Sequence, residues 1–158
     1  MSDEFPMTVH GKKTLDEELE NLIKVEREKT KNQISEARAH GDLKENADYH
    51  AAKEKQSQIE GRILEIQGKL ARVRVVDPTQ IKSETIVFGA TVTFLDVEKD
   101  EEHTYQLVGE DESDLKKNKI SFNSPLGSSM IGKEEGDTIT VHAPKGEREY
   151  EIINVEYK

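Results

Sequence analysis

The chain has 158 residues, of which 33% are hydrophobic and 35% are charged, and this composition argues against one compact core through its whole length. It has no cysteine, which excludes disulfides and thiolate metal sites, and its N-terminus MSDEFPMTVH and apolar runs lack the features of a leader or a membrane span, so we expect a soluble, cytoplasmic protein. The net charge of −10 lies mostly in residues 78–158, which carry 9 basic and 17 acidic residues, and such an acidic body disfavours DNA binding through bulk counterion release.

The first predicted element is a long helix. Thr14-Leu15-Asp16-Glu17 has the spacing of a capping box that would open it. Gly41 is expected to end it, because glycine tolerates a left-handed φ, and from Leu15 to Ala39 the helix would span about 37 Å at roughly 1.5 Å per residue. A narrow apolar seam follows the helix, first on one track and then on a shifted one: Leu15, Leu19, Leu22, Ile23, Thr30, Ile34 and Ala37.

The second predicted helix has a more regular pattern, in which seam residues lie alternately three and four positions apart. These residues are Tyr49, Ala52, Gln56, Ile59, Ile63, Ile66, Leu70 and Val73. The short linker GDLKEN forces the two helices to run antiparallel. Residues 1–77 are therefore predicted to form a two-stranded antiparallel coiled-coil arm, and the first break in the pattern falls at Asp77-Pro78.

Residues 78–158 are predicted to form a small α+β domain whose core comes mainly from one face of a twisted sheet. A weak helical segment is expected near Met130-Ile131-Gly132, after the loop NSPLGSS at residues 123–129. The strand candidates are Ile86–Phe88, Thr91–Asp96, His103–Val108, Lys119–Ser121, Asp137–Val141 and Glu149–Glu156.

Three acidic residues, Asp42, Glu45 and Asp48, fall at the turn of the predicted arm. They fit ordinary capping, with Asp42 as the N-cap of the second helix, Glu45 completing a reciprocal box and Asp48 favouring the helix dipole. They also fit part of a metal site, because Mg²⁺ takes six oxygen ligands and two exposed carboxylates could complete a site that another molecule supplies. The two interpretations are compatible, since a cap also fixes where carboxylates point.

Other polar residues surround this turn. His40 and His50 flank it, but a zinc site needs three or four convergent ligands and none is evident. Arg38, Lys44 and Lys53 are typical of solvated ion-pair partners. Beside paired carboxylates they could instead steer an RNA phosphate through charge-assisted hydrogen bonds.

Several stretches resemble bacterial transcription elongation factors of the GreA type, in the order expected of that family. They are EARAHGDLKENADYHAAKE, VFGATVTFL, ISFNSPLGSSMIGKEEGD and YEIINVEYK, and the resemblance runs from about Met7 to the C-terminus. The resemblance implies an α+β fold, in which an N-terminal antiparallel α-helical coiled-coil hairpin (residues 1–77) precedes a small FKBP-like domain (residues 78–158) that docks on polymerase. The protein is expected to be a monomer without a membrane partner.

The resemblance also implies a function. Factors of this type bind RNA polymerase at its secondary channel and insert the coiled coil toward the active centre. Tip carboxylates there help to hold a second Mg²⁺, so that the polymerase cuts its own backtracked transcript. The positions that match the acidic pair are Asp42 and Glu45, which would share the ion with polymerase and would not hold it tightly alone.

Further contacts follow from the same resemblance. Arg38 and Lys53 match a small basic patch near the RNA 3′ end, and Lys53 stands where arginine is expected, so it keeps the charge and loses the planar fork. Asn123, Ser124 and Pro125 fall in a region where polymerase contacts are expected, although a plain turn would equally suit this loop.

The protein implied is an accessory factor that lends residues to another enzyme. One alternative is a non-catalytic coiled-coil regulator that only docks on the channel or blocks it, and replacing Asp42 with asparagine would separate the two. A prolyl isomerase, suggested by fold analogy alone, ranks last because residues 78–158 have few aromatic side chains to spare from a core.

Overall fold

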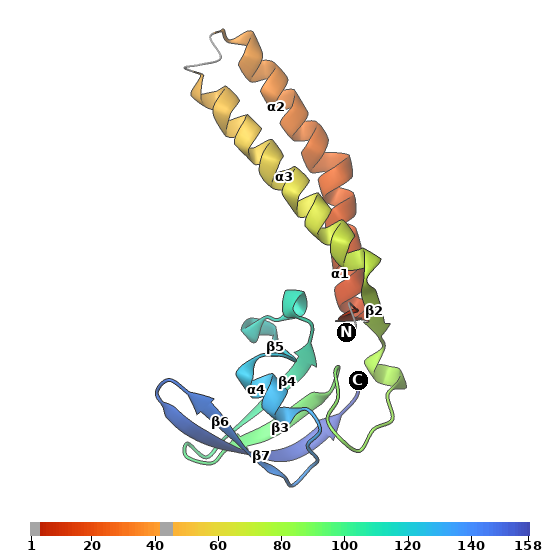
Figure 1. The fold of residues 1–158 in the computed structure, drawn as a ribbon, viewed down its shortest axis with the longest axis vertical. Helices are drawn as coiled ribbons and strands as arrows, with labels where there is room; N and C mark the ends of the chain where they lie inside the picture. The colour runs from red at the N-terminus through yellow and green to blue at the C-terminus, as the bar shows by residue number, and fades with distance from the viewer. Residues whose placement is uncertain (1–3, 42–45) are drawn as a thin grey trace. The chain divides into compact units, whose positions relative to one another are not determined.

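A computed structural model describes residues 4–41 and 46–158 (Figure 1). The described chain forms two compact units, one of residues 12–73 and one of residues 4–11 with 74–158. The first unit is a helical hairpin and the second is built on a five-stranded sheet, which confirms the predicted α+β fold. The units differ from the predicted ranges because residues 4–11 and 74–77 lie with the sheet.

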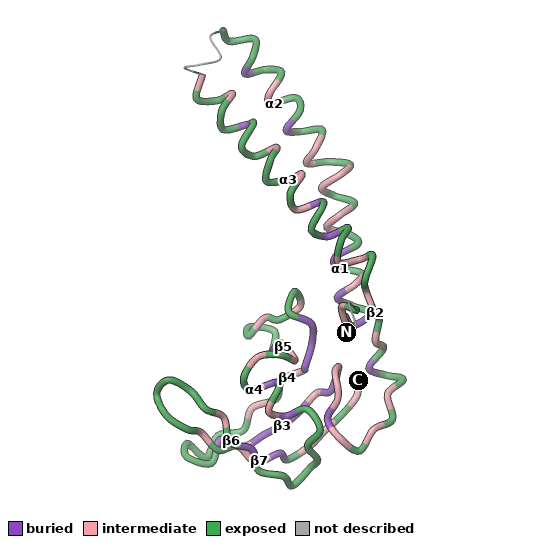
Figure 2. Tube along the Cα trace, viewed as in Figure 1, coloured by how far each residue is buried: buried purple, intermediate pink, exposed green. Residues whose placement is uncertain are grey.

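The hairpin consists of α1 (Val9–Asn21), a π-helical turn (Leu22–Glu26), α2 (Arg27–Ala39) and the returning helix α3 (Ala47–Ala71). Figure 2 shows that the buried positions of α2 and α3 lie where the two helices face each other. The predicted seam is confirmed at its centre, because its most buried members are Leu15, Thr30, Ala37, Ala52, Ile59, Ile63 and Ile66. The remaining seam positions are half-buried, as suits a two-helix layer with solvent on both sides.

The π-helical turn explains the shifted track of the first seam. A π-turn accommodates one extra residue within an α-helix, so the residues after it keep their rotational position about the helix axis while their spacing in the sequence shifts by one. Leu19 precedes this turn, Leu22 and Ile23 lie in it, and Ile34 follows it, and all four are half-buried. The seam therefore stays against α3 although its spacing changes.

Ion pairs border the seam. Arg27 donates to both carboxylate oxygens of Glu60, at 2.8 and 3.0 Å, and Arg62 donates to both oxygens of Glu18, at 2.6 and 2.8 Å. The hydrogen bond from Arg62 holds the pKa of the Glu18 carboxyl below its usual range. Because these side chains are about one-third to one-half exposed, solvent screens both pairs and each stabilises the hairpin only weakly.

The first helix starts earlier than predicted, at Val9, so the capping box proposed at Thr14 is wrong. Thr8 caps the helix, since its Oγ1 accepts the Gly11 N–H at 3.0 Å. The Glu112 carboxylate in turn accepts the Thr8 N–H at 3.0 Å and the Thr8 hydroxyl. A Cβ at Gly11 would lie 2.1 Å from Glu112 Cδ, so only glycine leaves room for this contact. Glycine is unfavourable inside a helix, and for this reason the sequence did not indicate that the helix begins before it.

Two short strands were not predicted. β1 (Phe5–Thr8) pairs with β2 (Val73–Val76), which begins two residues after α3 ends. Val73 is therefore not the last seam residue of the second helix, as its spacing suggested, but the first residue of a strand.

The sheet has the order β5-β4-β3-β7-β6, in which β4 and β5 are parallel and the other pairs are antiparallel. Its strands, each confirming a prediction to within a few residues, are β3 (Thr91–Asp96), β4 (Glu101–Val108), β5 (Lys119–Ser121), β6 (Thr138–Ala143) and β7 (Gly146–Glu156). The core on one face includes the fully buried Phe94, Leu107 and Met130.

The predicted strand Ile86–Phe88 is wrong. Ile86 lies in the core at 0% exposure, but its backbone bonds the loop after α4 instead of a strand. Its N–H donates to the Lys133 carbonyl, and its carbonyl accepts the Gly132 N–H, each at 2.8 Å. Burial rather than strand pairing accounts for its apolar side chain.

The stretch predicted as a loop at residues 123–129 contains the helix α4 (Pro125–Met130). Ser124 is its N-cap, because Ser124 Oγ accepts the Gly127 N–H at 3.1 Å and donates to the Ser121 carbonyl at 2.7 Å. A Cβ at Gly127 would lie 2.2 Å from that same carbonyl. Serine, proline and glycine thus serve here as cap, first helical residue and close-packing residue rather than as loop formers. Over the described ranges, the structure has no helix long and apolar enough to cross a membrane.

Candidate functional site

The closed end of the hairpin is bracketed by two well-defined helix termini. α2 ends at Ala39, and Gly41 follows with a φ of +116°, which confirms the predicted terminator. α3 begins at Ala47. Asp42, Lys44 and Glu45 lie outside the described residues, so the role of the predicted acidic pair stays a prediction.

Asn46 joins the two helices at this end. Its Oδ1 accepts the Tyr49 N–H at 3.0 Å, and its Nδ2 donates to the Ala37 carbonyl in the last turn of α2. Asn46 is therefore the N-cap of α3, and the proposed capping role of Asp42 at this helix is wrong. Asp48 lies in the first turn of α3, where it suits the helix dipole.

The two bonds of Asn46 can be separated by mutation. Aspartate at this position keeps the acceptor for the Tyr49 N–H and loses the donor to the Ala37 carbonyl, whereas alanine loses both. We expect Asn46→Ala to accelerate hydrogen exchange of the Tyr49 amide roughly fivefold, since a cap contributes about 1 kcal/mol. Asn46→Asp should leave that exchange nearly unchanged, and equal acceleration in both variants would contradict the assignment of the cap.

The predicted RNA-contacting residues share one flank of the hairpin. Arg38 follows buried Ala37 by one position, and Lys53 follows buried Ala52 by one position. Each residue rotates an α-helix by about 100°, so in two antiparallel helices facing each other both side chains turn toward the same side. Both are exposed, and Lys53 Nζ donates to Gln56 Oε1 at 3.3 Å.

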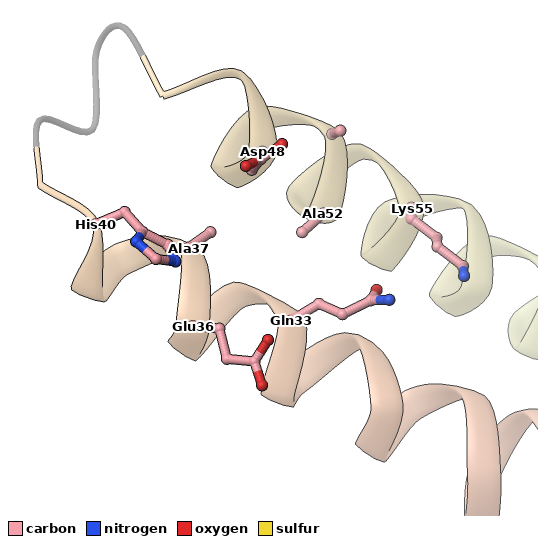
Figure 3. A pocket seen from close by; sticks show the side chains of 8 residues that line it. Gln33, Glu36, Ala37, His40, Asp48, Ala52 and Lys55 are labelled. Atoms are coloured by element: carbon pink, nitrogen blue, oxygen red, sulfur yellow. The ribbon is translucent and has the colours of Figure 1, made fainter.

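An open groove of about 330 Å³ occupies the opposite flank (Figure 3). It lies between the last two turns of α2 and the first turns of α3. Glu36 and Ala51 each lie one position before a seam alanine, whereas Arg38 and Lys53 each lie one position after one, which places the groove on the other side of the seam. The lining residues are Gln33, Glu36, Ala37, His40, Asp48, Ala51, Ala52 and Lys55. His40 and Asp48 were recognisable in the sequence as residues near the turn, but the groove was not predicted.

The donor set near the tip fits only part of a metal site. Among the residues that the structure describes, no three His, Asp or Glu side chains lie together in a way that could hold a metal ion. Asp42 and Glu45 would add two carboxylates. Mg²⁺ prefers six oxygens with near-octahedral geometry, so this donor set suits an ion whose remaining ligands come from elsewhere.

The predicted docking residues differ in what they do within the fold. Asn123 is exposed, and its Nδ2 donates to Glu110 Oε1. Pro125 is exposed at the first position of α4, whereas Ser124 is half-buried and used as the cap. Asn123 and Pro125 are thus available to a partner, and Ser124 is primarily structural.

Both halves of the chain match known protein families. Residues 5–75 match the family model "Transcription elongation factor, N-terminal", and residues 81–157 match "Transcription elongation factor, GreA/GreB, C-term". The first match covers the helical hairpin and the second covers the sheet domain. The protein is therefore of the class of two-part transcription elongation factors.

Proteins named transcription elongation factor GreA are similar over nearly the whole chain. The one from Thermodesulfovibrio yellowstonii is 52% identical over 158 residues and covers 100% of both chains, and the one from Alkalilimnicola ehrlichii is 54% identical and covers 96% of this chain and 97% of its own. Among solved structures, GreA factor homolog 1 of Thermus thermophilus is 26% identical with a TM-score of 0.44, covering 97% of this chain and 99% of its own. The chain belongs to the GreA/GreB family of transcription elongation factors.

Proposed function

We propose that this protein is a cytoplasmic, monomeric transcription elongation factor that binds RNA polymerase at its secondary channel. There it stimulates the Mg²⁺-dependent cleavage of backtracked nascent RNA by the polymerase and so rescues arrested complexes. The observation that carries this proposal is membership of the GreA/GreB family over both parts of the chain. The factor lends side chains to the polymerase active site and is not itself an enzyme.

The hairpin has dimensions suited to this task. α3 has 25 residues, which corresponds to about 37 Å at roughly 1.5 Å per residue. The hairpin is only two helices across, so it can enter a passage too narrow for a globular domain. Asn46 ties the start of α3 to the last turn of α2 at the closed end of the hairpin.

Asp42 and Glu45 are the side chains that would hold Mg²⁺ jointly with polymerase. When bound, the ion would supply positive charge that activates water and stabilises the leaving oxygen of a phosphodiester. The task of the carboxylates is to accept hydrogen bonds and to add negative charge at the correct place. Arg38 and Lys53, on one flank of the same tip, would bind RNA phosphate, the arginine through its planar fork and the lysine as a point charge.

The isolated protein should not bind Mg²⁺ tightly. Two carboxylates replace too few of the six water molecules around the ion to give micromolar affinity. Calorimetric titration of the isolated protein with Mg²⁺ should therefore show no saturable heat at micromolar concentrations. Micromolar binding without polymerase would contradict a site that is shared with the enzyme.

Docking by the second unit can be tested at the start of α4. Replacing Asn123 and Pro125 with alanine should weaken competition for polymerase without unfolding the domain, since both side chains are exposed. Ser124→Ala is a poorer probe, because loss of the cap costs about 1 kcal/mol of stability. Unchanged competition by the Asn123 and Pro125 variants would remove this segment from the interface.

The decisive test of the function uses stalled elongation complexes that hold backtracked RNA. Incubation with the protein and Mg²⁺ should shorten the transcripts from their 3′ ends and let elongation resume. A factor that binds polymerase and inhibits it without cleavage would be the non-catalytic regulator.

A further inference from the structure

The groove at the closed end of the hairpin is lined in a way that suggests a ligand. The buried Ala37 and Ala52 line it where the helices meet, the exposed Ala51 also lines it, and longer polar side chains stand around them (Figure 3). Glu36 comes from α2, His40 directly follows this helix, and Gln33 lies one turn further from the tip on α2. Asp48 and Lys55 come from α3. The surface thus combines a shallow apolar floor with hydrogen-bonding groups along its edges.

The carboxylates of this groove are not used by the described fold. Within residues 4–41 and 46–158, neither Glu36 nor Asp48 has a side-chain hydrogen bond or ion pair, and both are exposed. Further along the hairpin, Glu18 and Glu60 are each bound by two nitrogens of an arginine. The described lining of the groove contains two carboxylates, Glu36 and Asp48, and one lysine, Lys55, so the groove has a formal excess of negative charge.

This chemistry favours one occupant over the others. A phosphate would be repelled by the carboxylates, and a bare metal ion would find too few converging ligands in the described chain. A guanidinium offers five donors in a planar fork that matches carboxylate oxygens, and its methylene stem can pack on apolar side chains. Glu18 and Glu60 show the same preference within this hairpin.

We propose that this groove binds an arginine side chain projecting from the wall of the RNA polymerase channel. This proposal rests on the proposed function, because it needs the hairpin to enter polymerase. The basic flank with Arg38 and Lys53 then faces RNA, and the carboxylate flank faces protein. Contacts of opposite sign on opposite flanks fix the rotation of the hairpin about its own axis, and catalytic groups tolerate misplacement of only about 1 Å.

Site-specific photocrosslinking in stalled elongation complexes tests which flank meets which partner. A photoreactive amino acid at Gln33 in the groove should crosslink to a polymerase subunit, at a peptide that contains an arginine. The same probe at Lys53 should crosslink to the nascent RNA. Crosslinks from Gln33 to RNA, or the same products from both positions, would overturn the proposal.

Charge removal gives a second test with a matched control. The double variant Glu36→Gln, Asp48→Asn should bind polymerase about tenfold more weakly or worse, since hydrogen bonds to charged groups are the strong ones, and its binding should depend less on salt. The control is Glu28→Gln, Glu54→Gln, which removes two exposed carboxylates that lie two positions from the buried Thr30 and Ala52 and so face away from the groove.

The controls separate this proposal from the function it rests on. If the unmodified protein stimulates cleavage while the groove variant binds like the control variant, the groove proposal fails and the function stands. If the unmodified protein does not stimulate cleavage, the function fails first. Circular dichroism of both double variants should match that of the unmodified chain, because glutamine and asparagine preserve the side-chain shapes.

Discussion

Replacing Asp42 with asparagine should abolish stimulated transcript cleavage while leaving polymerase binding nearly intact. Asparagine preserves the shape of the side chain but removes the negative charge that the proposed shared ion requires. Removal of one electrostatic contact to a reacting centre costs about 10²- to 10³-fold in rate, so the cleavage rate at saturating factor should fall by at least roughly a hundredfold.

The control for this variant is Glu54→Gln, which removes a carboxylate from the exposed outer side of α3. It should cleave at the unmodified rate. Glu45→Gln should resemble Asp42→Asn, and the double variant should lose little more, because residues that act on one centre are not additive. Normal cleavage by Asp42→Asn would show that stimulation does not depend on the Asp42 carboxylate.

A shortened hairpin should fold, bind polymerase through the sheet domain and fail to stimulate cleavage. Deleting Arg27–Gln33 from α2 and Glu54–Glu60 from α3 withdraws the tip by about 10 Å at roughly 1.5 Å per residue. The deletion removes Arg27 together with its partner Glu60 and keeps the pair of Arg62 with Glu18. Seven residues are one heptad, or about two helical turns, so the remaining seam stays in register.

Length and sequence must be separated in this experiment. A control of unchanged length should keep Thr30, Gln33, Lys55 and Ile59 and exchange the other residues of the two segments for helix formers of the same charge. This control should stimulate cleavage as the unmodified protein does. Because a displacement of about 1 Å can cost a hundredfold in rate, measurable cleavage by the shortened hairpin would rule out a mechanism based on reach.

The helices and most strands of this fold could be predicted from the spacing of apolar residues. An element that is buried on one side needs apolar residues at the repeat of its own geometry, and the sequence shows that repeat. The seam from Ala52 to Ile66 and the strand Thr91–Asp96 are examples. Short elements carry too few residues to show a period. β1 and β2 have four residues each and α4 has six, and all three were missed or taken for other structure.

The remaining errors concern residues whose roles depend on partners far away in the sequence. Position 11 is a glycine within a helix because the Glu112 side chain leaves no room there for a Cβ, and no residue near position 11 in the sequence indicates this contact. Asn46 could have been identified, since an asparagine directly before the helical spacing is a typical cap, but its bond to Ala37 required the pairing of the helices. The groove likewise exists only once α2 and α3 are side by side.

The π-helical turn at Leu22–Glu26 lets the first helix of the hairpin hold one extra residue without rotating its far end. Removing one residue from this turn should restore an uninterrupted α-helix and leave α2 in its present rotational position, because the turn absorbs one extra residue locally. Removing one residue between Arg27 and Gln33 would instead turn the end of α2 by about 100° and bring Arg38 into the position of Ala37. The rotational position of the tip therefore tolerates a change of length at this turn but not in the helix that follows it.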